Sequence, residues 1–211
     1  TEKPADAAAP VTTVSSTGVL GAGMFNKEAI ELQFTAEDGV NGSGVESIHY
    51  RWNQGAWLVA SGPVAVTQDG SYRLDYYSED MAGNVEAIQS VEFAIDRMAP
   101  GPALELQGTK GAADWYISSV NAVLTATDST SGVGKLEYQV STVSDTTYGA
   151  WKPYQLPVTL SDGMHEVAYK ATDKAGNESS VQKKAVKVDT MKPVVSVLAN
   201  GQPLELGRTF E

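Results

Sequence analysis

The segment Asp80-Met-Ala-Gly-Asn84 is matched 93 residues later by Asp173-Lys-Ala-Gly-Asn177. Other matching segments lie around it at offsets of 90 and 94 residues. They are Phe34-Thr-Ala-Glu-Asp38 with Leu124-Thr-Ala-Thr-Asp128, and Gly55-Ala-Trp57 with Gly149-Ala-Trp151. Self-similarity at a nearly fixed period is the signature of tandem structural repeats. The chain of 211 residues therefore contains two complete repeats.

These offsets define the expected domains. Residues 1–9 form a lead-in linker, and residues 10–98 and 99–191 form two domains of similar length. Residues 192–211 begin a third repeat that is cut short. Thr1 is not a start methionine, so we expect the chain to be an internal piece of a longer protein.

Each repeat is predicted to consist of β-strands. Ile30, Leu32, Phe34 and Ala36 alternate with polar residues, which is the period of two expected for a half-buried strand. Residues 120–126 repeat this pattern, and no stretch shows a helical period. Glycine and proline, with 20 and 9 residues, punctuate these segments. The pattern predicts an all-β fold of two tandem immunoglobulin-like β-sandwich domains.

The order of the repeated motifs also points to a family. Thr125-Ala-Thr-Asp128, Ser131-Gly-Val133, Trp151 and the segment 171–177 follow one another in the second repeat. This order resembles the bacterial immunoglobulin-like repeats of exported and cell-surface proteins, such as outer-membrane repeat proteins and accessory modules of secreted hydrolases. The resemblance covers both full repeats. It implies an extracellular or cell-surface location and a spacer or binding role, with no reaction.

Composition excludes several classes of function. There is no cysteine, so the chain has no disulfide, no thiol nucleophile and no thiolate metal site. The formal charge of −11 argues against nucleic acid as a partner and favours cations. The apolar runs are too short to span a bilayer.

We expect no catalytic residues and therefore no enzyme. The chain has only 2 histidines, His49 and His165, and neither recurs in the other repeat. A general base needs a cleft and an orienting partner. A sandwich of this size rarely offers a cleft deep enough for a carboxylate pair to act on a substrate.

Repeated aspartates are the candidate metal ligands. In this topology the ends of the second and sixth strands meet the incoming linker, which groups Asp6 with Asp38 and Asp80. The second repeat groups Asp96 with Asp128 and Asp173 in the same way. One interpretation is turn chemistry, because Asp and Asn bond the backbone of their own turns. The alternative is a calcium ion that stiffens each domain junction, for which carbonyls and water must complete the ligand shell.

Aromatic residues raise the alternative of carbohydrate binding. Trp57 and Trp151 recur at matching places, so we interpret them as packing residues. Trp115 and Tyr148 are not matched by an aromatic residue of the same kind in the first repeat, which makes them the better ligand candidates. The preferred hypothesis is a non-catalytic, semi-rigid extracellular spacer whose partners are its neighbouring domains. The competing hypothesis is an adhesion or carbohydrate-binding module for a glycan or a surface protein.

Overall fold

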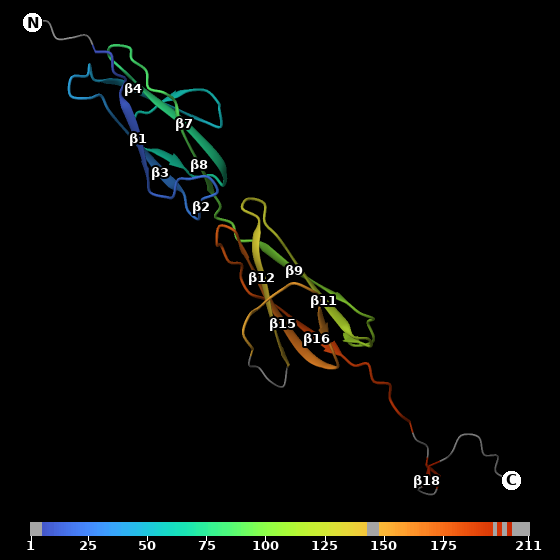
Figure 1. The fold of residues 1–211 in the computed structure, drawn as a ribbon. Coiled ribbons are helices and arrows are strands. Elements are labelled where there is room, and N and C mark those ends of the chain that lie inside the picture. Colours follow the sequence, from blue (N-terminus) through green and yellow to red (C-terminus); the bar gives the residue numbers. More distant parts are fainter. Residues whose placement is uncertain (1–5, 143–147, 196–197, 200–201, 204–211) are drawn as a thin grey trace, which may run out of the picture.

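A computed structural model describes residues 6–142, 148–195, 198–199 and 202–203. The described residues form strands and no helix (Figure 1). The strands of the first repeat are β1 (Val11–Ser16), β2 (Phe25–Asn26), β3 (Ile30–Glu37), β4 (Val45–Trp52), β5 (Leu58–Val59), β6 (Val64–Val66), β7 (Gly70–Asp80) and β8 (Gln89–Ile95). Those of the second are β9 (Gly101–Gln107), β10 (Trp115–Tyr116), β11 (Val120–Thr127), β12 (Val133–Thr142), β13 (Lys152–Pro153), β14 (Val158–Leu160), β15 (Gly163–Asp173) and β16 (Gln182–Val188). A short pair, β17 (Leu198–Ala199) and β18 (Gln202–Pro203), follows.

Strands β1–β8 form the first sandwich. One sheet has the order β1-β3-β6 and the other has the order β2-β8-β7-β4-β5. All neighbours are antiparallel except β2, which runs parallel to β8. This is the strand arrangement of an immunoglobulin-like sandwich, so the predicted all-β fold class is confirmed.

The core of the first sandwich lies between the inward faces of these sheets. Ile30, Leu32 and Phe34 of β3 are buried, as their alternation with polar residues predicts. Leu74 of β7 and Ile95 of β8 meet them from the opposite sheet. Aromatic rings supply much of this core, because Tyr50, Trp52, Tyr72 and Tyr76 pack against it. The core therefore forms without a disulfide.

Strands β9–β16 form the second sandwich with the same connectivity. Its sheets have the orders β14-β11-β9 and β10-β16-β15-β12-β13. Val120, Leu160, Val167 and Val188 form its buried centre, to which aliphatic side chains contribute more than in the first sandwich. The boundary residues of the two domains stay the prediction made above, and most of the predicted third repeat lies outside the described residues.

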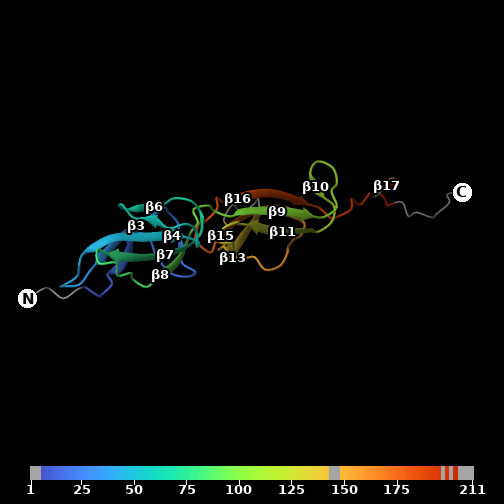
Figure 2. The ribbon, with the colours of Figure 1, turned by 90° about the horizontal axis from the view of Figure 1, so that it is seen from above.

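The two sandwiches are arranged end to end (Figures 1 and 2). Only residues 96–100 separate the end of β8 from the start of β9. This short connection brings the carboxyl end of β8 close to the turns that follow β11 and β15 of the second sandwich. The connection therefore positions the candidate metal-binding residues.

Candidate metal centres

Three aspartates meet at the amino-terminal end of each sandwich. In the first, Asp6 precedes β1, Asp38 follows β3 and Asp80 ends β7. One carboxylate oxygen of each lies within 4.8 Å of the others. Asp96, Asp128 and Asp173 form the same arrangement in the second sandwich. We call these groups the first and the second aspartate cluster.

Two members of each cluster cap tight turns. The Asp38 Oδ2 atom accepts a hydrogen bond of 2.6 Å from the backbone N–H of Gly44. Asp80 Oδ1 accepts hydrogen bonds from the N–H groups of Ala82 and Asn84, at 2.9 and 2.8 Å. These contacts have the geometry of the turn interpretation, in which an aspartate satisfies nearby backbone donors.

The second cluster repeats these turn contacts. Asp128 Oδ1 accepts from the Gly132 N–H at 2.7 Å, and Asp173 Oδ1 accepts from the Asn177 N–H at 2.8 Å. Gly132 has a φ of 78°, in the left-handed region that glycine adopts at little cost. The repeated Ser-Gly and Gly-Asn pairs therefore serve the same local geometry in both sandwiches.

The linker aspartate is the third member of each cluster. Asp6 Oδ2 accepts a hydrogen bond of 2.6 Å from the Ser43 N–H. Asp6 Oδ1 accepts a second one from the Ala8 N–H at 3.1 Å. These backbone donors, Ala8 first and then Ser43, hold the pKa of Asp6 below its ordinary value of 3.8. The carboxylate form of Asp6 is therefore part of the folded structure.

The clusters concentrate negative charge in a buried place. Asp80 and Asp96 are fully buried, and Asp173 is only 5% exposed. In the part of the chain that the structure describes, no Lys or Arg forms an ion pair with any of the six carboxylates. Carboxylates this close repel one another electrostatically, and a bound cation would offset that repulsion. Three carboxylates fit the oxygen-rich shell of a hard cation, which takes six to eight ligands including carbonyls and water.

The other predicted ligand residues, Trp115 and Tyr148, are not members of the aspartate clusters. Trp115 is half-buried in β10, where it pairs with Lys187 of β16. Tyr148 is also half-buried, and the Lys183 amino group lies 4.6 Å from the centre of its ring. The Tyr148 hydroxyl is buried and has no hydrogen-bond partner among the described residues. Trp115 and Tyr148 thus lie beside different lysines of β16, Lys187 and Lys183.

The recurrent tryptophans pack on the outward sheet face. The Arg51 guanidinium lies 4.5 Å from the centre of the Trp57 ring, and Trp57 meets Tyr77 edge-on at 4.7 Å. Lys170 covers Trp151 in the same way, at 4.8 Å. Each tryptophan is a packing residue beneath a cation, on the face that points away from the core.

His49 and His165 have structural partners. His165 is 9% exposed, and its Nε2 atom lies 2.8 Å from the Ser161 carbonyl oxygen. His49 stacks on Tyr77 at 4.8 Å and hydrogen-bonds Ser47 at 2.7 Å. Neither imidazole ring is part of an aspartate cluster.

Two features escaped the sequence reasoning. Asp75, which is 1% exposed, is hydrogen-bonded by Arg51 and Arg73 on the outward face of the first sandwich. The second feature is a pocket in the second sandwich, lined by Lys110, Lys184 and Lys187 among others. The alternating positions of Arg73 and Asp75 on one strand could have revealed the first. Comparing the two repeats position by position could have revealed the second.

These features define a tandem of immunoglobulin-like sandwiches with a linker aspartate built into each. Residues 112–190 match the model of the family described as bacterial Ig-like domain. That segment comprises most of the second sandwich, and its match confirms the resemblance inferred from the motifs. A search of curated proteins gives no match.

Several solved structures resemble the chain. The fibronectin(III)-like modules of Clostridium thermocellum CbhA share 14% identity at a TM-score of 0.38, over 89% of this chain and 100% of that one. The D00-D0 domain of intimin shares 12% identity at a TM-score of 0.38, over 84% and 100%. Three N-terminal domains of the bacteriophage RB49 outer capsid protein Hoc share 12% identity at a TM-score of 0.27, over 85% and 59%.

The described residues contain no helix that is long and apolar enough to cross a membrane.

Proposed function

We propose that the chain is a non-catalytic, semi-rigid spacer within a longer exported bacterial protein, outside the cell or on its surface. It would hold a neighbouring domain at a set distance. The match of the second sandwich to the bacterial Ig-like family supports the location and the absence of a reaction. The end-to-end arrangement of the sandwiches supports the spacer role (Figure 2).

The observation that carries this proposal is the double attachment of Asp96. Its backbone N–H donates a hydrogen bond of 2.9 Å to the Asn26 carbonyl of the first sandwich. Its Oδ2 atom accepts a hydrogen bond of 3.0 Å from the Ser131 N–H of the second sandwich. Because one fully buried residue bonds both bodies, rotation of one sandwich against the other must break buried hydrogen bonds.

Further contacts restrict the same junction. The side chain of Asn177 donates a hydrogen bond of 2.9 Å to the Asp96 carbonyl. Lys27 of the first sandwich donates one of 3.0 Å to the Gly176 carbonyl of the second. Pro100 is buried and has a fixed φ, which removes freedom from the residue before β9. The linker is thus short, hydrogen-bonded and conformationally restricted.

Calcium in the aspartate clusters is the second part of the proposal. A cation bound by Asp96, Asp128 and Asp173 would attach the linker to the two turns of the second sandwich. The supporting observations are the close approach of the three carboxylates and their lack of a basic partner among the described residues. The spacer part stands without the cation, because the hydrogen bonds of Asp96 already join the two sandwiches.

Residual dipolar couplings measured on the whole chain test the spacer. A rigid junction gives both sandwiches one common alignment tensor. In the Asp96→Ala variant we expect two different tensors, because the variant keeps the chain connection and loses the hydrogen bond to Ser131. Two unrelated tensors in the unaltered chain, with and without calcium, would overturn the proposal.

The matched control is Glu105→Ala, which removes the same charge from an exposed position of β9. It should keep the common tensor. Asp96→Ala could lose the common tensor because the junction becomes flexible or because a sandwich unfolds. Circular dichroism distinguishes these causes, because only an unfolded sandwich loses the β spectrum.

A further inference from the structure

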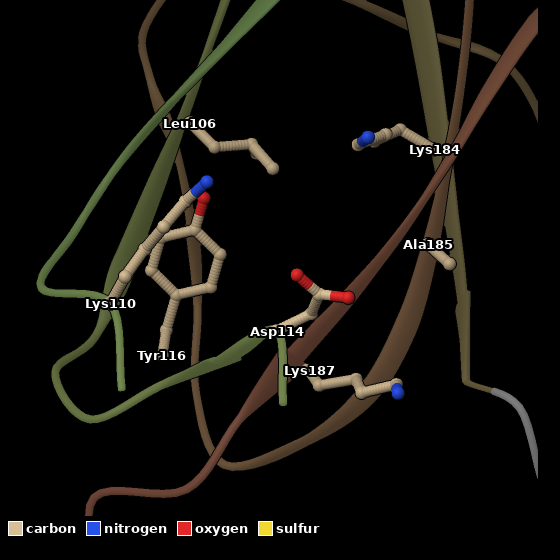
Figure 3. Close-up of a pocket in the computed structure, with 7 residues that line it drawn as sticks. All are labelled: Leu106, Lys110, Asp114, Tyr116, Lys184, Ala185 and Lys187. Atoms are coloured by element: carbon tan, nitrogen blue, oxygen red, sulfur yellow. The ribbon is translucent and has the colours of Figure 1, made fainter. Parts of the chain in front are cut away.

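The second sandwich contains a basic pocket that the spacer role does not use. It has a volume of about 250 Å³ and lies between the loop after β9 and the edge of β16. The lining residues are Leu106, Lys110, Asp114, Tyr116, Lys184, Ala185 and Lys187. Figure 3 shows the amino groups of Lys110 and Lys184 on either side of the space, with the Asp114 carboxylate below it.

The lysines of this pocket lack acidic partners. Among the described residues, no carboxylate forms an ion pair with Lys110, Lys184 or Lys187. Elsewhere on the same sandwich, Lys135, Lys170 and Lys183 each pair with a glutamate. Three lysines and one carboxylate, that of Asp114, line the pocket, so its net charge is positive although the whole chain carries a formal charge of −11.

The first sandwich shows that the fold does not require these lysines. Alignment of the two repeats places Lys110, Lys184 and Lys187 at the positions of Leu20, Val91 and Ala94. Leu20 and Val91 pack against the core of the first sandwich. Apolar side chains at these positions pack on the core of the first sandwich, whereas lysines at the same positions line a pocket in the second sandwich. Such a difference between repeats is where function is added to a scaffold.

The charge of the whole chain follows the same division. Residues 1–98 contain 5 Lys and Arg against 14 Asp and Glu, whereas residues 99–191 contain 8 against 10. The acidic character of the chain therefore belongs mainly to the first repeat. An anion approaching the second repeat meets a much weaker repulsive field.

The loop beside the pocket holds Asp114 in an uncommon conformation. Ala113 and Asp114 have φ angles of 52° and 62°, in the left-handed region that side chains other than glycine rarely adopt. The turn closes with a hydrogen bond of 3.1 Å from the Trp115 N–H to the Ala112 carbonyl. At the position of Ala113 the first repeat has Gly23, which suits a positive φ. This turn sets the backbone position of Asp114, whose carboxylate lines the pocket.

The edge of β16 also leaves the pocket accessible. Strand β10 pairs only with Lys187 and Val188, so among the described strands none lies beside Lys184 and Ala185 on that edge. The ring that lines the pocket is that of Tyr116, and the Lys110 amino group lies 5.9 Å from its centre. An aromatic ring with a few polar groups around it is the usual lining of a small-molecule site.

We propose that this pocket binds an acidic saccharide, with the lysines on an anionic substituent and Asp114 accepting from a hydroxyl. The volume is below the roughly 300–1,000 Å³ of sites for drug-sized ligands, which suits one sugar unit. The anionic group is a carboxylate or a phosphate, because a lysine binds either as a point charge.

Titrations with defined oligosaccharides, followed by NMR of the whole chain, test this proposal. The probes are a galacturonate trimer, its neutral methyl ester and a glycerol-phosphate trimer. We expect shifts at Lys110, Asp114 and Lys184 with an acidic probe and none with the ester. The two acidic probes distinguish a carboxylate from a phosphate. The absence of shifts with both at millimolar concentration would overturn the proposal.

The matched variant replaces the three lysines by the residues of the first repeat: Lys110→Leu, Lys184→Val and Lys187→Ala. We expect a loss of affinity of roughly tenfold or more, because charge-assisted hydrogen bonds are lost. Lys183→Ala on the neighbouring outward position should keep the affinity. If Lys183→Ala abolishes binding and the triple variant does not, the ligand lies at Tyr148 and the pocket proposal is wrong.

Discussion

At the scale of single residues, Asp75 is a carboxylate on an outward sheet face that neighbouring side chains bury. Asp75 lies on the outward face of the first sandwich, yet only 1% of it is exposed, because Arg51 and Arg73 cover it. Ser90 donates a third hydrogen bond of 2.7 Å to it. Burial raises the pKa of Asp75, but the hydrogen bonds from Ser90, Arg73 and Arg51 outweigh burial and lower it below 3.8.

Replacing Asp75 should destabilise the first sandwich selectively. In Asp75→Asn the two guanidinium groups lose their shared counter-charge, and we expect a cost of about 2 kcal/mol in the free energy of unfolding. Urea unfolding monitored by tryptophan fluorescence measures it. Glu92→Gln, at the more distant and exposed partner of Arg73, should change the stability by less than about 0.5 kcal/mol.

The lowered pKa values of Asp6 and Asp75 predict acid sensitivity. A carboxylate whose pKa is lower in the folded chain stabilises the fold above its unfolded pKa, and this stabilisation is lost as pH falls through the folded pKa. Stability should therefore be flat near neutral pH and decrease below pH 3.8. Thermal unfolding between pH 2 and pH 7 tests this, and the decrease should be smaller in Asp75→Asn.

A strained turn offers a stabilising change. Asn53 and Gln54 connect β4 to β5 with φ angles of 49° and 62°. Asn-Gly is the preferred pair for such a turn, because glycine has no Cβ to clash in the left-handed region. We expect Gln54→Gly to raise the free energy of unfolding by about 1 kcal/mol. A lower melting temperature would contradict this explanation.

At the scale of strands, side chains close the exposed edge of β1. The Glu86 carboxylate accepts hydrogen bonds from the Thr12 N–H at 3.1 Å and the Thr12 hydroxyl at 2.6 Å. It also accepts one from the Ser78 N–H at 3.2 Å, so it ties β1 to β7 across the sandwich. At the corresponding position the second repeat has Ser179, whose hydroxyl accepts from the Ala171 N–H at 3.0 Å.

We expect Glu86→Ala to loosen β1 while leaving the rest of the first sandwich folded. The Thr12 N–H would lose its partner, at a cost of about 1–3 kcal/mol. Hydrogen exchange read by NMR should accelerate at Thr12 and Val14 more than at Leu32. Equal acceleration at all three residues would contradict a local role of Glu86.

Much at this scale followed from the sequence, because the period of two determines which face of a strand is buried. Ile30, Leu32 and Phe34 were placed correctly on that ground alone. The aspartate groups could be predicted because strand topology decides which turns share an end. Comparing the repeats shows that Lys184 replaces the apolar Val91, but the accessibility of Lys184 depends on where β10 ends, and the sequence pattern does not define that end. Asp75 was missed because a period of two does not distinguish a covered polar face from a solvated one.

At the scale of the whole molecule, the same backbone hydrogen bond fixes an aspartate at the end of each sandwich. The Asp189 N–H donates a hydrogen bond of 2.8 Å to the Tyr116 carbonyl, as the Asp96 N–H does to Asn26. Each sandwich therefore ends by holding an aspartate in place. Asp6 and Asp96 each accept a hydrogen bond from a turn of the sandwich that follows them, at the Ser43 N–H and the Ser131 N–H.

If calcium occupies the clusters, it should stabilise the chain. Millimolar calcium would raise the melting temperature, because a ligand that binds only the folded state adds RT ln(1 + [L]/Kd) to its stability. Differential scanning calorimetry with calcium, with magnesium and with EDTA measures this. Asp128→Asn should remove the shift of the second sandwich and leave that of the first. An unchanged melting temperature would mean that the aspartates serve as turn caps alone.

The parallel pairing of β2 with β8 has a mechanical consequence. Phe25 and Asn26 pair with Ala94 and Ile95, directly before the linker, and Trp115 and Tyr116 pair with the end of β16 in the same way. Tension along the rod pulls β8 and β16 past these short strands, so it loads the interstrand hydrogen bonds in shear. Bonds loaded in shear share the force and break together, whereas a hairpin pulled from its open end unzips one bond at a time. Each sandwich would thus resist stretching at the strand that transmits the load to its neighbour.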